Sequence, residues 1–335
     1  MKVLIIRFSS IGDIVLTTPV IRSVKVQFED GEVHFCTKKN YADLVENNPY
    51  VDKVLTLDGS LSELIKRIQK EKYDGIIDLH NNLRTRIIKW RTGVKTWSFN
   101  KLNLEKWMMV ALKIDQLPNL HIVERYAQAA AKLGVKLDKL GLDYFIPEKD
   151  EVPRDWLPVT HQREYAVVAI GGQHATKRLP FQKLVQLCDK INKPVILLGG
   201  VEDAAVGERL ELFFGRDNGN GHLEAGLERL NKRAIIFNGC GKFNLNQAAS
   251  VIKGARWVFS HDTGLMHIAA AFKKDIFSIW GNTIPQFGMY PYHTHFTVIE
   301  KTGLPCRPCS KIGYDKCPKG HFRCMNDLEF DFYLE

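Results

Sequence analysis

Residues 260–267, SHDTGLMH, join an apolar, strand-like run to a helix-like run. The first backbone N–H groups of a helix have no partner within the helix, so a junction of this kind suits a phosphate. Asp262 or Thr263 can cap the helix, Gly264 lets a ligand approach the backbone, and His267 lies about one turn further on. A capped helix without a ligand has the same pattern, so the motif alone leaves both interpretations open.

Other polar loops also directly follow strand-like runs. Doubly wound sheets bind ligands at the carboxyl ends of their strands, so the side chains of these loops are candidates for chemistry. Neither half of the chain has a G-x-G-x-x-G after its first strand, so a dinucleotide cofactor is not indicated. The candidate loops contain Ser9, Ser10, Gly12 and Asp13, then His80, Asn81, Asn82 and Arg84, then residues 171–178 and residues 199–203.

The elements that must position these loops alternate between strand-like and helix-like segments. This alternation indicates βαβ units and parallel sheets. The pattern restarts after a polar, proline-containing segment at residues 147–158. We therefore predict an α/β fold of two doubly wound, Rossmann-like domains that face each other across a cleft, spanning residues 1–155 and 156–335. Strands are predicted over residues 2–8, 32–36, 53–57 and 74–80 in the first half, and over 165–170, 194–198, 233–237, 256–260 and 275–280 in the second.

The composition is that of a globular protein that can bury a full core, with 335 residues of which 45% are hydrophobic. No apolar run approaches the roughly 18 residues needed to span a bilayer. The N-terminus also lacks the long apolar stretch and cleavage site of a signal peptide. We therefore expect a cytoplasmic protein.

Positive charge is concentrated in residues 84–113, which hold eight basic residues and one acid, Glu105, interleaved with Trp90, Trp97, Phe99 and Trp107. This mixture fits a surface that meets anionic lipid headgroups, an acidic substrate or nucleic acid. A solvated helix face with buried tryptophans is the alternative. Within the stretch, residues 103–113, NLEKWMMVALK, are typical either of an interfacial helix or of an amphipathic helix that faces a core.

Four of the seven cysteines lie close together near the C-terminus. Their spacing, C-x2-C-x7-C-x6-C, is not that of an ordinary zinc ribbon or finger. In a cytoplasmic protein such a cluster indicates metal more than disulfide, so a zinc site is one interpretation. A Pro- and Cys-rich loop packed through its thiols is the other. The four residues are Cys306, Cys309, Cys317 and Cys324.

Five segments carry a resemblance that runs almost end to end. They are VLIIRFSSIGDIVLTTPVIRSVK near the N-terminus, DLHNNLRT at 78–85, GGQHATKRLP at 171–180, SHDTGLMHIAAA at 260–271 and PCRPC at 305–309. On these segments the chain resembles glycosyltransferase family 9, the ADP-heptose:lipopolysaccharide heptosyltransferases, which have the two-domain GT-B fold. The resemblance implies an N-terminal acceptor-binding domain that carries the base. It also implies a C-terminal donor-binding domain with a Cys-rich loop at residues 305–324.

The resemblance also implies roles for the candidate side chains. Asp13 matches the general base of the family, although a helix often has an acid in its first turn without any catalytic role. Lys177 matches a phosphate-binding lysine, Glu202 an acid that accepts hydrogen bonds from ribose, and Phe243 an adenine contact, for which core packing is the alternative. The full donor set is Lys177, Glu202, Phe243, Asp262, Thr263, Gly264, Leu265 and His267, and the acceptor set is Ser10, His80, Asn82 and Arg84.

The implied reaction is an inverting transfer of heptose from ADP-heptose to the anionic inner core of lipopolysaccharide at the cytoplasmic membrane surface. We expect no metal, since no Asp-x-Asp tripeptide occurs in the sequence to hold a cation, and we also expect no cofactor and no nucleic-acid partner. Another GT-B transferase or a nucleotide-sugar epimerase is the nearest alternative, because a fold does not fix chemistry. A zinc-containing nucleic-acid-binding protein is a more distant alternative, motivated by the basic stretch and the cysteines.

Overall fold

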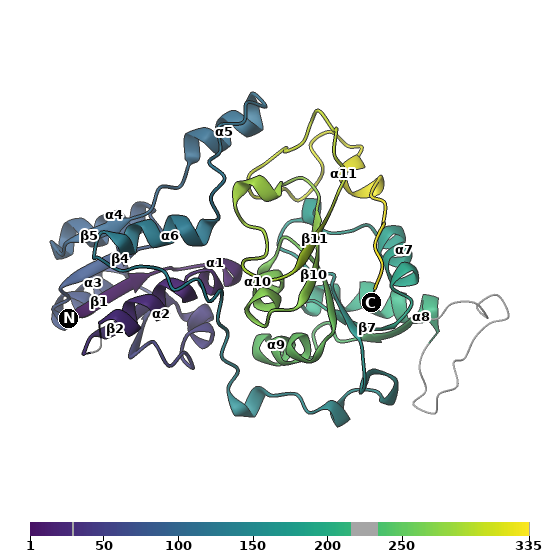
Figure 1. Cartoon of the computed structure of the whole chain (residues 1–335), viewed down its shortest axis with the longest axis horizontal. Helices are drawn as coiled ribbons and strands as arrows, with labels where there is room; N and C mark the ends of the chain where they lie inside the picture. The colour runs from purple at the N-terminus through teal and green to yellow at the C-terminus, as the bar shows by residue number, and fades with distance from the viewer. Residues whose placement is uncertain (29, 216–233, 335) are drawn as a thin grey trace. The chain divides into compact units, whose positions relative to one another are not determined.

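The computed structural model describes residues 1–28, 30–215 and 234–334, and the chain forms two compact units (Figure 1). The first unit comprises Met1–Asn103 and Pro118–Pro147, and the second comprises Leu104–Leu117 and Glu148–Glu335. The chain therefore enters the second unit twice, over Leu104–Leu117 and again from Glu148, whereas the sequence analysis placed a single boundary after residue 155. The predicted roles of the two domains remain predictions.

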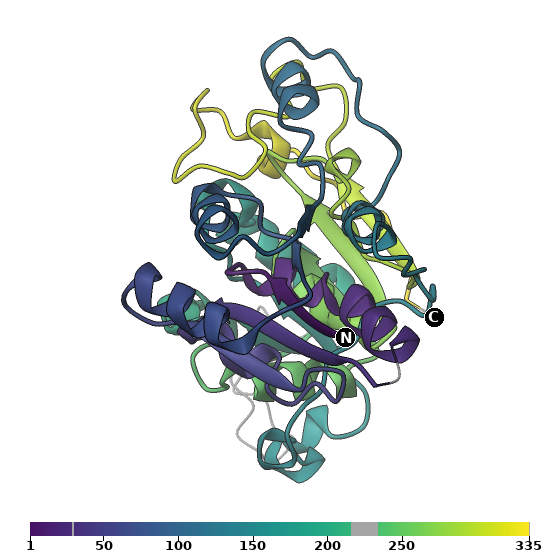
Figure 2. The same cartoon turned by 90° about the vertical axis from the view of Figure 1, so that its left-hand side faces the viewer.

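The first unit is a five-stranded sheet with the order β3-β2-β1-β4-β5, in which all neighbouring strands are parallel. Helices lie on both sides of this sheet (Figure 2). Helix α2 contacts α6, and α3 contacts α4. The strands are β1 (Lys2–Ile6), β2 (Glu32–Lys38), β3 (Lys53–Leu57), β4 (Gly75–Asp78) and β5 (Thr96–Ser98), and the helices are α1 (Ile11–Val15), α2 (Thr18–Gln27), α3 (Leu61–Glu71), α4 (Leu83–Thr92) and α6 (Ile122–Ala131).

The second unit contains a six-stranded parallel sheet with the order β11-β10-β9-β6-β7-β8. Its strands are continuous apolar runs because helices cover both faces of a parallel sheet. The strands are β6 (Ala166–Ala169), β7 (Pro194–Leu198), β8 (Ile235–Asn238), β9 (Trp257–His261), β10 (Asp275–Trp280) and β11 (Phe296–Glu300), and the helices are α5 (Asn103–Ala111), α7 (Phe181–Ile191), α8 (Ala204–Phe214), α9 (Leu245–Gly254), α10 (Gly264–Ala271) and α11 (Arg323–Asn326).

The prediction of two parallel α/β sheets is confirmed, and each of the nine predicted strands overlaps an observed strand. Arg233, at the start of one predicted strand, lies outside the described residues. The prediction missed β5 and β11, which are the outermost strands on one side of their sheets. β5 has only three residues, and β11 is an edge strand with a mixed burial pattern, so neither has the long apolar run of a buried parallel strand.

The strand orders identify where each sheet can bind a ligand. In each sheet the order reverses between two neighbouring strands, β1 and β4 in the first unit and β6 and β9 in the second. A ligand of a doubly wound sheet binds outside the carboxyl ends of the strands at such a reversal. Asp13 and His80 follow β1 and β4, and Lys177 and Asp262 follow β6 and β9. Candidate site residues that the sequence predicted therefore follow the strands at the reversal of strand order in both sheets.

Candidate active site

Asp13 lies in the first turn of α1, directly after the β1 strand and its Ser9-Ser10 loop. One carboxylate oxygen, Oδ2, accepts hydrogen bonds from the Ser10 hydroxyl at 2.8 Å and from the Ser10 backbone N–H at 3.2 Å. The other, Oδ1, lies 2.6 Å from Nη2 of Arg7. The side chain of Asp13 remains 22% exposed, so a substrate hydroxyl can still reach the carboxylate. The structure thus brings two predicted residues, Ser10 and Asp13, into direct contact.

The surroundings of Asp13 keep its carboxylate ionised. Burial alone would raise the pKa of Asp13, but the charge of Arg7 and the hydrogen bonds from Ser10 outweigh burial and hold the pKa below its usual value. Arg7 is itself 8% exposed and is fixed by hydrogen bonds from Nε to the Ser9 carbonyl and from Nη1 to the Leu79 carbonyl. Asp13 is therefore ionised at neutral pH and is held in place by Arg7 and Ser10.

Two residues beside Asp13 were missed by the sequence analysis. Arg7 was overlooked because it belongs to an apolar strand-like run, although a charged residue at the end of such a run is a usable signal. Tyr126 comes from α6, and its ring centroid lies 5.8 Å from Cζ of Arg7. The Tyr126 ring also packs edge-on against Phe99 at 4.8 Å. No local pattern links residue 126 to residue 13, because the contact depends on how α6 packs.

The other predicted acceptor residues follow β4. His80 packs edge-on against Phe8, with ring centroids 5.3 Å apart. Burial, reinforced by the nearby charge of Arg7, lowers the pKa of His80 to about 4, so its imidazole is neutral at neutral pH. Asn82 caps α4, because its side-chain oxygen accepts the Thr85 backbone N–H at 3.0 Å. Arg84, in the first turn of α4, is exposed and lines a pocket of the first unit.

The second unit brings Lys177 and Asp262 together across the β6–β9 reversal. Lys177 Nζ lies 2.6 Å from Oδ2 of Asp262 and donates to the Asp262 carbonyl at 3.1 Å. The hydroxyl of Thr283, which follows β10, donates to the same Oδ2 at 3.2 Å. The sequence analysis missed Thr283, although its position at the end of a predicted strand placed it at this edge of the sheet. Asp262 therefore orients the lysine amine.

Helix α10 begins at Gly264, as the sequence predicted, and Thr263 occupies the N-cap position. The Thr263 side chain does not cap the helix but lies 3.3 Å from the Ser260 hydroxyl. Gly264 and Leu265 are the first residues of the helix. His267 is only 2% exposed, so it belongs to the interior of the unit. Gly264 and Leu265 are half-buried at the start of α10, whereas His267 is buried further along the helix.

Glu202 and Phe243 lie further along the same edge of the second sheet. Glu202 is exposed and follows β7. Phe243 follows β8, is half-buried and contacts Phe237 edge-on with ring centroids 6.5 Å apart. A Cβ on Gly239 would lie 2.9 Å from Phe243, so this glycine lets the phenylalanine ring approach the backbone. The packing of Phe243 is compatible both with an adenine contact and with a role in core packing.

The basic, tryptophan-bearing stretch divides between the two units. Phe99 is buried in the first unit, whereas Trp90 is 84% exposed. Trp107 lies on α5, a helix with no buried residues, and is 56% exposed. The residues of α5 after Asn103 belong to the second unit. The expected helix at residues 103–113 is present over Asn103–Ala111, and it does not face a core.

The four clustered cysteines are all free thiols. Cys309 donates its thiol to the Cys306 carbonyl at 2.9 Å, and Cys306 lies 3.8 Å from Nε2 of His321. Burial and the neighbouring thiols raise the pKa of Cys324 to about 12. Across residues 1–28, 30–215 and 234–334, no group of three or more His, Cys, Asp or Glu side chains is arranged to hold a metal ion. The described thiols therefore lend no support to the zinc interpretation.

The family model of glycosyltransferase family 9 (heptosyltransferase) matches residues 61–317. The chain belongs to glycosyltransferase family 9. It is 24% identical to lipooligosaccharide heptosyltransferase 2 of Haemophilus influenzae, over 100% of this chain and 98% of that protein. The prediction of a glycosyltransferase of the heptosyltransferase family is confirmed.

Solved structures of this glycosyltransferase family share the fold. The structure of Escherichia coli ADP-heptose LPS heptosyltransferase II has a TM-score of 0.68 and 18% identity, with 98% of each chain covered. The E. coli heptosyltransferase WaaC with ADP-2-deoxy-2-fluoro heptose has a TM-score of 0.64 and 20% identity, with 90% of this chain and 94% of that chain covered. The predicted GT-B fold is confirmed.

Proposed function

We propose that this heptosyltransferase transfers a heptose from ADP-heptose to the anionic inner core of lipopolysaccharide, with inversion at the anomeric carbon and without a metal ion. Membership of glycosyltransferase family 9 supports the type of reaction. The observation that carries the mechanism is Asp13, which is partly exposed and held ionised by Arg7 and Ser10 at the reversal of the first sheet. The choice of acceptor follows the names of the relatives.

The order of the donor residues along the second sheet supports a nucleotide sugar. The strands β9, β6, β7 and β8 are consecutive neighbours, and they are followed by Asp262, Lys177, Glu202 and Phe243 in that order. Neighbouring strands are about 4.8 Å apart, so these positions extend over about 14 Å. A cation and a helix start at one end suit the diphosphate, an acid in the middle suits the ribose, and an aromatic ring at the far end suits adenine.

In the proposed reaction the acceptor hydroxyl oxygen attacks the anomeric carbon while the bond from that carbon to the phosphate oxygen breaks. The hydroxyl proton passes to Asp13, and the electron pair of the broken bond leaves with ADP. Attack from the face opposite to ADP inverts the configuration. Negative charge grows on the departing diphosphate, and the amine of Lys177 with the N-terminus of α10 stabilises it. Asp262 is paired with Lys177 in this structure, so the diphosphate has to displace Asp262 before the amine can supply positive charge in place of a metal cation.

The exposed helix α5 supports action at a membrane surface. Trp107 and Leu104 are exposed, and Lys101 and Lys106 lie nearby in the sequence. Apolar side chains interleaved with lysines bind the interface of an anionic membrane. No helix in the described ranges is long and apolar enough to cross a bilayer. We propose a peripheral location on the inner face of the inner membrane, where the acceptor is anchored.

A transfer assay with defined products tests the proposed function. The purified chain is incubated with a lipopolysaccharide acceptor that lacks heptose, in EDTA, with ADP-heptose, UDP-glucose or GDP-mannose as donor. We expect transfer from ADP-heptose alone, and NMR of the product should show inversion at the anomeric carbon. Transfer from another nucleotide sugar would overturn the donor, retention would overturn the role of Asp13, and loss of activity in EDTA would overturn metal independence.

A further inference from the structure

A buried tyrosine hydroxyl lies beside the proposed base. Tyr126 belongs to α6 and is fully buried in the first unit. Its hydroxyl makes no hydrogen bond of ordinary geometry with any group in residues 1–28, 30–215 and 234–334. A buried polar group without a partner destabilises the folded protein, so an exception of this kind indicates a role that the fold alone does not explain.

The ring of Tyr126 is packed between two neighbours. It contacts Phe99 edge-on at 4.8 Å, and Cζ of Arg7 lies over the ring, 5.8 Å from its centroid. A cation within about 6 Å of an aromatic ring is attracted by the charge distribution of the ring. The ring therefore helps to hold the Arg7 guanidinium, whose Nη2 lies 2.6 Å from Oδ1 of Asp13.

The hydroxyl of Tyr126 is a neutral donor close to a carboxylate that can accept it. Burial raises the pKa of Tyr126, the charge of Arg7 opposes this rise and that of Asp13 adds to it, so the phenol is protonated at neutral pH. An ionised carboxylate has about four sites for hydrogen bonds. Ser10 occupies two of these sites on Oδ2 of Asp13, and Arg7 occupies one on Oδ1. One site on Oδ1 therefore remains for a further donor.

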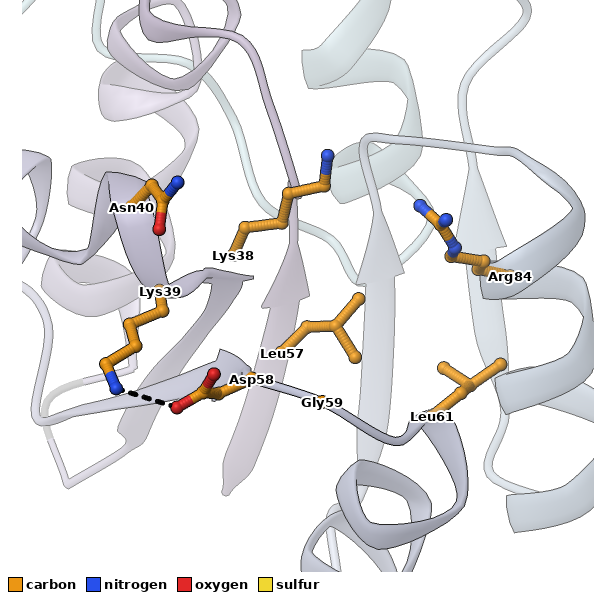
Figure 3. Close-up of a pocket in the computed structure, with 8 residues that line it drawn as sticks. All are labelled: Lys38, Lys39, Asn40, Leu57, Asp58, Gly59, Leu61 and Arg84. Carbon is orange, nitrogen blue, oxygen red and sulfur yellow. Dashed lines mark hydrogen bonds and ion pairs between the residues drawn. The ribbon is translucent and has the colours of Figure 1, made fainter.

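Tyr126 has no direct route to a substrate. Its exposed fraction is 0%. The pocket that Figure 3 shows is lined by residues of other segments, among them Lys38, Leu57 and Arg84, and Tyr126 is not one of its lining residues. Tyr126 can therefore influence a reaction only through the protein groups that it contacts.

We propose that Tyr126 is a positioning residue for Asp13, with its ring against Arg7 and its hydroxyl as a further donor to the carboxylate. This inference rests on the proposed function, in which Asp13 accepts the proton of the acceptor hydroxyl. The acceptor hydroxyl approaches Oδ2, where it replaces the exposed bond from the Ser10 hydroxyl. The Tyr126 hydroxyl then donates to Oδ1 from the buried side, which keeps the carboxylate in place and ionised.

Other charged groups surround this site, so their effects have to be separated from that of Tyr126. The pKa of His80 is about 4, so His80 gains a positive charge in the acidic range. A cation near Asp13 lowers the pKa of Asp13, so charged His80 opposes the protonation of the base. The groups that act on Arg7, His80 or Tyr126 from neighbouring segments are Asp78 of β4, Lys101 before α5 and Arg125 of α6.

The test uses the full-length chain with Tyr126→Phe, which keeps the ring and removes the hydroxyl. Tyr73→Phe is the matched control, because Tyr73 is a buried tyrosine of the same unit whose hydroxyl pairs with His34. NMR of labelled aspartate carboxyl groups, with the Asp13 signal assigned by its loss in Asp13→Asn, measures the pKa of Asp13. Tyr126→Phe should raise the proton affinity of Asp13 about tenfold, the effect of one lost hydrogen bond to a charged group, and Tyr73→Phe should leave it unchanged.

Kinetics connect this contact to the reaction. On the acidic limb of the pH profile, kcat of Tyr126→Phe should be about tenfold below that of wild type, because a larger fraction of Asp13 is protonated. The KM values for donor and acceptor should stay unchanged, because Tyr126 does not touch a substrate. In the Asp13→Asn background the same replacement should have no further effect on kcat. Tyr126→Leu should lower kcat more than Tyr126→Phe, because Arg7 also loses the aromatic ring.

Three results would overturn the proposal. Tyr126→Phe could leave the pKa of Asp13 at the wild-type value, which would exclude the hydroxyl as a donor. It could lower kcat as much in the Asp13→Asn background as in wild type, which would place its action elsewhere. Tyr126→Leu could match Tyr126→Phe at every pH, which would show that the ring does not hold Arg7.

The NMR titration needs no transfer of heptose, so it separates this inference from the proposed function. A raised pKa of Asp13 in Tyr126→Phe, in a chain that transfers no heptose, would support the contact and overturn the proposed function. Transfer by wild type, together with an unchanged pKa of Asp13 in Tyr126→Phe, would support the proposed function and overturn the role of Tyr126.

Discussion

Replacing Asp13 with Asn is the most direct test of the proposed mechanism. The amide keeps the size of the side chain but removes the proton acceptor. A positioned general base contributes about 10²- to 10⁴-fold to a rate, so we expect kcat to fall within this range. The affinity for ADP-heptose should be unchanged, because the predicted donor residues all belong to the second unit. Steady-state transfer and donor calorimetry together measure these two effects.

The same replacement should also destabilise the first unit. Arg7 is 8% exposed and would lose the carboxylate that lies 2.6 Å from its Nη2. Removing one partner of a buried ion pair costs about 3–5 kcal/mol. We expect a value near the lower end, because Arg7 keeps its bonds to the Ser9 and Leu79 carbonyls and because Asp13 is 22% exposed. Urea denaturation of wild type and variant measures this loss.

Arg7→Gln provides the complementary control. Without the guanidinium charge, burial raises the pKa of Asp13, so the base becomes protonated at higher pH. The acidic limb of the kcat profile should therefore move to higher pH in Arg7→Gln, whereas Asp13→Asn should be slow at every pH. The double variant should be more stable than Asp13→Asn alone, because no unpaired cation remains buried.

Two results would refute this reasoning. If Asp13→Asn binds donor normally and keeps kcat within about threefold of wild type, Asp13 is not the base, because that loss lies far below the contribution of a general base. If Asp13→Asn is slow but Arg7→Gln leaves the acidic limb in place, Asp13 acts without being tuned by Arg7. The pH profile thus separates the identity of the base from the control of its ionisation.

Four other replacements test separate parts of the structure. Burial lowers the pKa of His261 to about 4, so as the pH falls His261 takes up a proton in the unfolded chain before it does so in the folded protein. The free energy of unfolding of wild type should therefore fall by up to about 3 kcal/mol between pH 6.5 and 4. Urea denaturation should show a smaller fall for His261→Gln. Lys177→Met should weaken ADP-heptose binding about tenfold or more in calorimetry with the acceptor KM unchanged, and undiminished binding would remove Lys177 from the donor site. Gly281→Ala should lower the Tm and cost about 1–3 kcal/mol, because the new Cβ would lie 2.5 Å from a methionine methyl and 2.8 Å from a backbone carbonyl; an unchanged Tm would contradict this packing. Trp107→Ala should weaken sedimentation with anionic vesicles but not transfer to a soluble acceptor, and equal sedimentation would exclude α5 as the membrane contact.

The sequence predicted the elements of this fold better than it predicted their contacts. Buried parallel strands are continuous apolar runs, so strands such as β7 and β10 were found with their observed bounds. Between β1 and β2 the chain forms two helices, α1 and α2, with Pro19 at the start of the second. Proline suits the first turn of a helix, and this local signal could have located the break.

Sequence patterns could not predict most of the charged partners of the candidate residues. Ser10 and Asp13 lie three residues apart at the start of a helix, so their contact is local and was predictable. Lys177 and Asp262 are 85 residues apart, and only the strand order makes them neighbours. The pairing leaves Lys177 neutralised in this structure, so a diphosphate must compete with Asp262 for the amine.

The difference between these two pairs has a physical origin in the topology. Asp13 and its partner Arg7 flank the end of β1, so their ion pair joins neighbouring segments of the chain, although the Leu79 carbonyl after β4 also helps to fix Arg7. Lys177 follows β6 and Asp262 follows β9, so their contact requires the two strands to pair in parallel at the reversal of the sheet. A change that shifts the β6–β9 register would separate Lys177 from Asp262 and leave Asp13 and Arg7 in contact. The pair of Asp13 and Arg7 therefore forms mainly between neighbouring segments, whereas the pair of Lys177 and Asp262 exists only once the second sheet has formed.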